Sequence, residues 1–144
     1  MAILRQESAF QNRVKPERTK LFGIIPWKRK SSSFGYTQAI DATWEWYRQE
    51  NKKPLASRVN FADAVDFVGW YINKTNTINN ISKNDAFNQY LAYHEGHGGF
   101  RNETYKNKDW LLDVANQVKA RANNYQGQLQ TCEHKFEKKF LGIF

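Results

Sequence analysis

The stretch NFADAVDFVGWYI (residues 60–72) carries the pattern that decides the fold. Asn60 is a typical N-cap residue, because its side-chain oxygen accepts a hydrogen bond from the first turn of a helix. Apolar residues then recur at the three- and four-residue spacing of one helix face, namely Phe61, Val65, Val68 and Ile72. The stretch therefore predicts an amphipathic helix with these four side chains buried.

Similar patterns predict four more helices. The first covers residues 2–13, with Ile3, Glu7 and Phe10 on one face, and the second covers residues 40–50. Another begins after Ser82, a capping residue with Asp85 three positions later. The last begins near Lys108, and its apolar stripe comprises Leu111, Ala115, Val118, Ala122, Tyr125 and Leu129. Because no segment shows sustained strand alternation, the chain is predicted to be all-α.

Two segments remain open to interpretation. The connection 14–34 is rich in Pro, Gly and Ser and contains the apolar stretch 21–27 and the basic run Lys28 to Lys30. In one interpretation, this connection covers a cleft or contacts a membrane, and its basic run meets anionic groups. In the other, it packs on the first helix and Trp27 lies in the core. The tail 132–144 is either a short amphipathic helix or a loosely attached terminus.

Length and composition narrow the classes of protein. The 144 residues suit one compact domain, here expected over 1–130 with a tail at 131–144. The net charge of +8 favours anionic partners such as nucleic acid, lipid headgroups or cell wall. Cys132 is the only cysteine, so no internal disulfide is predicted, and no apolar run is long enough to span a bilayer.

Glu7 is the first residue with a chemical interpretation. On a face shared with Ile3 and Phe10, its carboxyl is expected to face the interior, which raises the pKa of a carboxyl group. A carboxyl that stays protonated near neutral pH can act as a general acid at a glycosidic oxygen. The alternative is that Glu7 is a paired or peripheral residue.

Two other segments carry polar residues in turns. In residues 33–44, Gly35 allows close backbone approach and Gln38 both donates and accepts hydrogen bonds, before Asp41 or Thr43 starts a helix. In residues 91–100, His94 and His97 stand three apart, whereas the zinc-protease motif needs histidines four apart on a continuous helix. No metal site is therefore predicted.

Taken in order, the three segments resemble the soluble lytic transglycosylase family, whose fold is shared with goose-type lysozyme. Glu7-Ser8-Ala9-Phe10 matches the family's Glu-Ser-x-aromatic motif. Gly35, Gln38 and Thr43 match its Gly-Leu-Met-Gln motif and the Thr that follows, and residues 92–96 match Ala-Tyr-Asn-x-Gly except for the Asn. Trp110, or Tyr105, matches an aromatic at the start of the last helix. The resemblance spans residue 3 to about residue 125.

The sequence departs from the family's pattern in three places. Tyr36 and Thr37 replace an apolar pair, which makes the cleft floor more polar, and His94 replaces the Asn. The connection between Glu7 and Gly35 is also longer than usual, by the stretch from Leu21 to Lys30. The chain therefore resembles a divergent branch of the family.

The resemblance implies a lysozyme-like helical domain with a substrate cleft. It implies a peptidoglycan lytic transglycosylase that needs no cofactor, with Glu7 as single acid and base. The candidate substrate-binding residues are Ser8, Ser32, Gly35, Tyr36, Gln38, Tyr93, His94, Glu95 and Trp110. Two alternatives remain: a hydrolytic lysozyme in which Glu95 activates water, although Glu95 is expected to point to solvent, and a non-catalytic wall-binding module.

The resemblance also implies partners and a location. Peptidoglycan strands are the expected partner of a monomeric protein, with an anionic membrane surface or a cell-wall complex as further possibilities. Nucleic-acid binding would explain the charge but none of the motifs. The expected location is the periplasm or cell envelope, with a lipid anchor conceivable in a full-length protein. Because Met1 leads directly into a predicted helix, we expect the chain to be a fragment that lacks an export signal.

Overall fold

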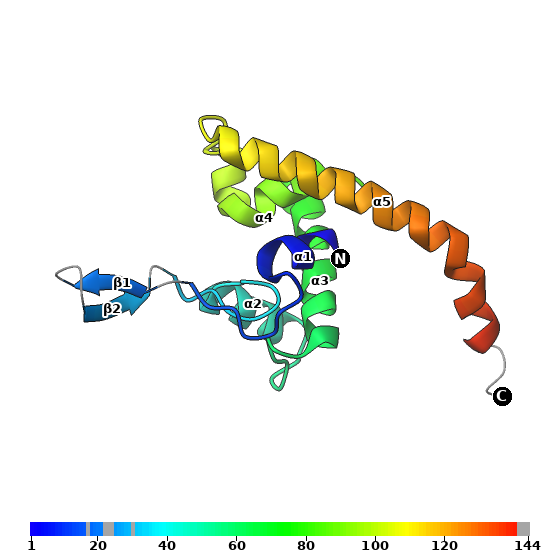
Figure 1. Ribbon diagram of the computed structural model, residues 1–144, viewed down its shortest axis with the longest axis horizontal. Helices are drawn as coiled ribbons and strands as arrows, with labels where there is room; N and C mark the ends of the chain where they lie inside the picture. The colour runs from blue at the N-terminus through cyan, green and yellow to red at the C-terminus, as the bar shows by residue number, and fades with distance from the viewer. Residues whose placement is uncertain (17, 22–24, 30, 141–144) are drawn as a thin grey trace. The chain divides into compact units, whose positions relative to one another are not determined.

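The computed structural model describes residues 1–16, 18–21, 25–29 and 31–140, with the backbone alone for 18–21, 25–29 and 135–140. Within these residues it contains the predicted five helices, labelled in Figure 1. They are α1 (Ala2–Ser8), α2 (Asp41–Glu50), α3 (Phe61–Asn79), α4 (Ala86–Arg101) and α5 (Asp109–Phe140). The predicted helical fold class is confirmed.

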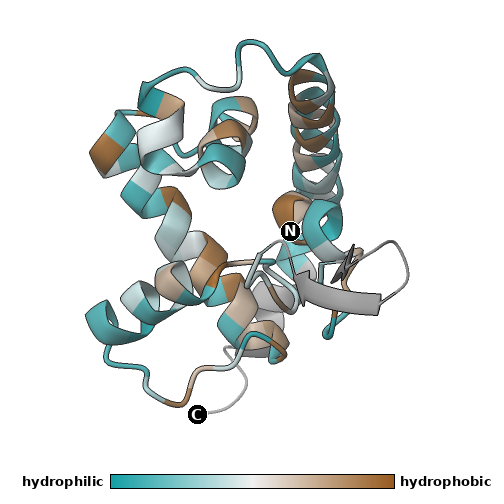
Figure 2. Ribbon diagram, turned by 90° about the vertical axis from the view of Figure 1, so that its left-hand side faces the viewer, coloured by the Kyte–Doolittle hydropathy of each residue, from teal (hydrophilic) through white to brown (hydrophobic). Residues whose placement is uncertain are grey.

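The chain divides into two compact units. One comprises Ile3–Lys74, and the other comprises Met1–Ala2 with Thr75–Phe144. Helix α3 begins in the former and ends in the latter. Figure 2 shows hydrophobic and hydrophilic residues interspersed along the helices, as expected of amphipathic segments. Among the described residues, no helix is long and apolar enough to cross a membrane.

Helix α1 is shorter than predicted. It ends at Ser8 instead of residue 13, because Ala9 and Phe10 adopt left-handed conformations with φ of +50° and +63°. Phe10 therefore leaves the helical face that it was expected to share with Ile3 and Glu7. It is 36% exposed, whereas Ile3 and Leu4 are buried.

A β-hairpin interrupts the connection that was predicted to contain no strand. Strand β1 (Arg18–Leu21) pairs antiparallel with β2 (Ile25–Arg29), with Leu21 opposite Ile25 and Arg18 opposite Arg29. The strand sequences RTKL and IPWKR do not alternate between apolar and polar residues, so the sequence pattern did not indicate them. The two interpretations of Trp27 and of Lys28 to Lys30 concern side chains outside the described residues.

Aromatic rings form the core of the unit Ile3–Lys74. Trp44 and Tyr47 of α2 pack against Phe67 of α3, with ring centroids 5.0 and 5.3 Å from it. Tyr47 and Phe67 are fully buried. This packing fixes which face of α3 is buried, and it lies on Ala64, Phe67, Val68, Tyr71 and Thr75.

The buried face of α3 therefore differs from the predicted one. Asn60 caps the helix as expected, since its Oδ1 accepts the Asp63 N–H at 3.1 Å. Of the four predicted core residues, however, Phe61 and Val65 are about two-fifths exposed, and only Val68 is fully in the core. The buried face is rotated around the helix axis by about one residue from the predicted face. The prediction used apolar spacing alone and left out the large rings of Phe67 and Tyr71, which the core contains.

Helix α4 packs against α5 in the second unit. Asp85, not Ser82, caps α4, because its side chain accepts the Asn88 N–H. The predicted stripe on α5 is fully buried at Leu111, Ala115 and Val118 and reaches the surface by Leu129, which is 50% exposed. The predicted tail is helical as far as residue 140, as a continuation of α5.

Candidate functional site

Gly35 starts the turn that carries the second motif. Its N–H donates to the Val14 carbonyl at 3.1 Å, and the next N–H, of Tyr36, donates to the Arg58 carbonyl at 3.1 Å. The φ of Gly35 is +74°, and a Cβ at this position would lie 2.3 Å from the Arg58 carbonyl oxygen. Only glycine fits this conformation and this approach.

The Gln38 carboxamide holds the same turn closed. Gln38 has a φ of +51°, and its Nε2 donates to the carbonyl oxygens of Val14 at 3.0 Å and Gly35 at 2.8 Å. Both hydrogens of Nε2 are thus used inside the protein. Oε1, which accepts a long 3.4 Å bond from Ser33 Oγ, is the atom that Gln38 can still offer to a ligand.

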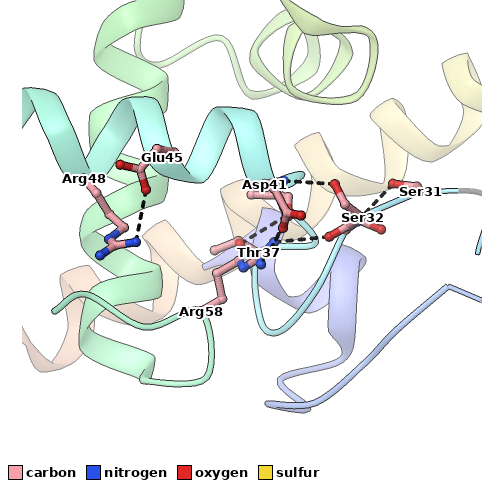
Figure 3. Close-up of polar contacts among 9 residues, drawn as sticks. Ser31, Ser32, Thr37, Asp41, Glu45, Arg48 and Arg58 are labelled. Atoms are coloured by element: carbon pink, nitrogen blue, oxygen red, sulfur yellow. Dashed lines mark hydrogen bonds and ion pairs between the residues drawn. The ribbon is translucent and has the colours of Figure 1, made fainter. Parts of the chain in front are cut away.

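Arg58 organises this turn, although no pattern in the sequence indicated it. Its guanidinium donates to the carbonyl oxygens of Ser32 at 3.2 Å and Ala39 at 2.9 Å, and to Asp41 Oδ1 at 2.7 Å (Figure 3). Ser32 Oγ also accepts the Asp41 N–H at 3.0 Å. Ser32, a predicted substrate-binding residue, thus links the turn to the start of α2. No motif surrounds Arg58, so nothing in the sequence signalled this role.

Glu7 and Ser8 are the last two residues of α1. Glu7 is partly buried, and Ser8 is buried, with its Oγ donating to the Leu4 carbonyl at 3.1 Å. The rings of Phe10 and Tyr36 both meet Phe61 edge-on, with centroid distances of 6.4 and 5.4 Å. Phe61 therefore connects the segment of the first motif with that of the second.

The third motif lies in α4, where Gly96 kinks the helix with a φ of +74° and a ψ of 162°. Tyr93 is partly buried. The Glu95 side chain is only 5% exposed, which contradicts the expectation that it points to solvent. Lys108 Nζ lies 2.8 Å from each of its oxygens, His94 Nδ1 lies 2.9 Å from Oε1, and the Thr104 hydroxyl donates to Oε2.

These contacts set the charge of Glu95. Burial opposes ionisation, but the hydrogen bonds from Lys108, Thr104 and His94, together with the Lys108 charge, outweigh it and lower the pKa of Glu95 to about 2. Glu95 is therefore a carboxylate whose two oxygens are both occupied. The sequence could not show this, because Lys108 lies 13 residues further along the chain.

His94 lies between two aromatic rings. The His94 ring meets Trp110 at 5.3 Å and 77°, and Tyr90 at 6.4 Å. Trp110, the second residue of α5, is 56% exposed. Tyr105, the alternative for the fourth motif, is instead stacked on Phe100 at 5.2 Å.

The two histidines of the glycine-rich segment have different partners. His97 Nε2 lies 3.0 Å from Thr75 Oγ1, and Asn79 donates to the His97 carbonyl at 3.1 Å. Across the described part of the chain, no group of three His, Cys, Asp or Glu residues is placed to hold a metal ion. The spacing of His94 and His97 thus serves two separate contacts.

The candidate residues fall into the two units described above. The unit Ile3–Lys74 holds Glu7 and the other candidates from the first two motifs: Ser8, Ser32, Gly35, Tyr36 and Gln38. The second unit holds those from the third motif and from α5: Tyr93, His94, Glu95 and Trp110. Within each unit, the contacts above connect segments that are distant in sequence.

Comparison with known proteins identifies the family. The model of the transglycosylase SLT domain matches residues 1–132. Comparisons with curated proteins and with solved structures find no match to the chain. The matched region covers α1 to α4 completely and most of α5, and it includes every candidate residue. On this match, the chain belongs to the transglycosylase SLT domain family.

Proposed function

We propose that the chain is a lytic transglycosylase that cleaves the β-1,4 bond between N-acetylmuramic acid and N-acetylglucosamine and forms a 1,6-anhydro ring. The family consists generally of lytic transglycosylases and implies peptidoglycan as the substrate. Glu7 is the proposed single general acid and base. The choice of a single catalytic carboxyl group rests on Glu95, whose two oxygens already bind Lys108, His94 and Thr104. The third motif therefore offers no available second carboxyl group.

In the proposed reaction, the Glu7 carboxyl acts twice. The protonated carboxyl donates its proton to the glycosidic oxygen while the bond from that oxygen to the muramyl C1 breaks. The N-acetyl group of the substrate stabilises the positive charge at C1, as in substrate-assisted glycosidases. The Glu7 carboxylate then takes the proton of the muramyl 6-hydroxyl, whose oxygen bonds to C1. Water is not consumed, and Glu7 ends protonated.

The position of Glu7 suits this role. It is partly buried at the end of α1, beside a chain segment that turns away at once through two left-handed residues. A partly buried carboxyl can both meet a substrate and exchange a proton with it. In the same unit, two hydrogen bonds from Gln38 Nε2 close the turn of the second motif, and Gln38 Oε1 can still accept a bond from a ligand.

The hydrolytic alternative requires Glu95 to take a proton from water. Its oxygens already accept hydrogen bonds from Lys108, His94 and Thr104, and its pKa near 2 makes it a weak base at neutral pH. A general base works best with a pKa near the working pH. These observations favour the transglycosylase over the lysozyme.

The location and partners follow from the proposed substrate. We place the protein in the periplasm or cell envelope, acting as a monomer on peptidoglycan strands. The net charge of +8 would support its approach to an anionic polymer or membrane surface. The proposal needs no metal and no cofactor.

The decisive experiment digests purified peptidoglycan with the wild type, with Glu7→Gln and with Glu103→Gln. Glu103 is a matched control, because it is an exposed glutamate paired with Lys106. We expect anhydromuropeptides from the wild type and the control, and a rate at least about 100-fold lower from Glu7→Gln. Products with reducing ends would instead establish a lysozyme. Wall binding without any product would establish a non-catalytic module.

A further inference from the structure

The contact between His94 and Glu95 defines the tautomer of the histidine. His94 Nδ1 lies 2.9 Å from Glu95 Oε1, and a carboxylate can only accept a hydrogen bond. In the neutral ring, the proton must therefore be on Nδ1. The other nitrogen, Nε2, then carries a lone pair and is an acceptor.

The surroundings of Glu95 keep this contact in place. Lys108 binds both carboxylate oxygens at 2.8 Å, and the Thr104 hydroxyl donates to one of them. Gly99 permits the close approach, since a Cβ at this position would lie 3.1 Å from Glu95 Cβ and 3.1 Å from Thr104 Oγ1. The Thr104 N–H also donates to the Gly99 carbonyl at 3.1 Å. Glu95 is therefore a fixed support for the His94 ring.

Nε2 is the atom of His94 that remains for a ligand. The side chain is 34% exposed, and Nε2 has no hydrogen-bond partner among the residues that the structure describes. Next to it, Trp110 is 56% exposed, and its ring stands nearly perpendicular to the imidazole at a centroid distance of 5.3 Å. An acceptor on a partly exposed imidazole thus lies beside an exposed apolar side chain.

This pair of groups matches the chemistry of a sugar ring. Sugars carry hydroxyl donors on their edges and apolar C–H groups on their faces, and N-acetyl sugars add an amide N–H donor. We propose that Nε2 of His94 accepts the amide N–H of one N-acetyl sugar of the glycan, with the sugar face on Trp110 and with Glu95 as the positioning residue. This subsite rests on the proposed function, which supplies the glycan.

The proposal gives the subsite a pH dependence that an asparagine would not have. Protonation of His94 turns Nε2 from an acceptor into a donor, so the bond from the amide N–H of the sugar, which can only donate, is lost. The charged groups that face the ring are Glu95, in direct contact, and Lys108 behind it; the rings of Tyr90 and Trp110 flank it.

The test measures binding in a background that does not cleave. Glu7→Gln serves as the parent, and its dissociation constant for soluble, peptide-free glycan strands is measured by calorimetry at about pH 8 and about pH 5, which bracket histidine titration. His94→Ala and His94→Asn are added to this parent, with His134→Ala as the control, because His134 is exposed on α5.

We expect His94→Ala to weaken binding about 3- to 10-fold at the higher pH, the loss of one hydrogen bond. The parent and the control should weaken by a similar factor on acidification, whereas His94→Asn should bind equally at both values. Equal weakening of the parent and His94→Asn, or unchanged binding by His94→Ala, would overturn the proposal.

The positioning role of Glu95 has its own measurement. Nitrogen-15 spectra of the wild-type histidine rings should show the Nδ1–H tautomer at His94, and Glu95→Gln should reduce its population. A predominant Nε2–H tautomer in the wild type would refute the role, even if Glu95→Gln does not fold. If Glu7→Gln abolishes cleavage but glycan binding does not depend on pH, the proposed function stands and the subsite is refuted. If Glu7→Gln still cleaves but glycan binding depends on pH as described, the proposed function is refuted and the subsite stands.

Discussion

Replacing Gly35 with alanine should destabilise the domain more than any other single methyl addition at a described glycine. The new Cβ would lie 2.3 Å from the Arg58 carbonyl oxygen, 2.8 Å from its carbon and 2.9 Å from Arg58 Cβ. Two of these atoms are backbone, and the Arg58 side chain is itself bound to Ser32, Ala39 and Asp41. The clash therefore cannot be relieved by rotating a flexible side chain.

Two costs add up in this variant. An L-residue with the left-handed φ of Gly35, +74°, loses about 1–2 kcal/mol relative to glycine. Forcing a methyl group into a packed contact costs about 1–3 kcal/mol more. The free energy of unfolding should therefore fall by about 2–5 kcal/mol, a large part of the total stability of a domain.

Urea unfolding followed by circular dichroism measures this difference, and Gly69→Ala is the matched control. Gly69 lies in α3 in the same unit, and a Cβ there would have no atom within 4 Å. The Gly69→Ala substitution should raise the free energy of unfolding by about 0.5–1 kcal/mol, because alanine is more favourable than glycine inside a helix. If Gly35→Ala unfolds within about 0.5 kcal/mol of the wild type, the proposed approach of Gly35 to Arg58 is wrong.

Three further variants test other contacts. Gln38→Leu removes the donor to two carbonyl oxygens and should cost about 1–3 kcal/mol in urea unfolding. The same change at Gln49, an exposed residue that donates to the Glu45 side chain on the surface of α2, should cost under about 0.5 kcal/mol. Equal losses would argue against the closed turn. Arg58→Lys keeps the charge but not the three bonds, and should lower stability by about 1–3 kcal/mol; wild-type stability would contradict its organising role. Lys108→Met should cost about 1–3 kcal/mol near neutral pH, less than a fully buried pair, because the Lys108 side chain is 37% exposed. The Glu95 pKa is lowered from 4.5 to about 2, so the stabilisation by ionised Glu95 is present above pH 4.5 and is lost as the pH falls towards 2. The difference in melting temperature between Lys108→Met and the wild type should therefore shrink over that range. A constant difference would refute the ion-pair assignment.

Local signals in the sequence predicted the helices well but their edges less well. The cap at Asn60 and the span of α2 depend on neighbouring residues, so both could be predicted. The end of α1 depends on Ala9 and Phe10 adopting positive φ, and neither residue type signals that conformation. The buried face of α3 depends on the rings that α2 brings against it, which no pattern within α3 contains.

The candidate site divides in the same way. Gly35 and Gln38 could be singled out, because their conformational freedom and hydrogen-bonding capacity are properties of single residues. The role of Arg58 could not, since its partner Ser32 lies 26 residues away, and the state of Glu95 depends on Lys108 across a loop. Reasoning from residue type finds which side chains are capable of chemistry, whereas tertiary partners decide which of them are free for it.

Glu95 shows how such partners change a mechanistic argument. From the sequence, a glutamate beside a motif residue is a candidate second carboxyl, and a second carboxyl is what separates hydrolysis from anhydro-ring formation. In the structure, four hydrogen-bond contacts from Lys108, Thr104 and His94 fill its oxygens, and its pKa near 2 removes most of its basicity. The same contacts that disqualify Glu95 as a base orient His94 beside Trp110. A residue unsuited to proton transfer is thereby well suited to hold a neighbouring ring for binding, and the proton transfers remain with Glu7.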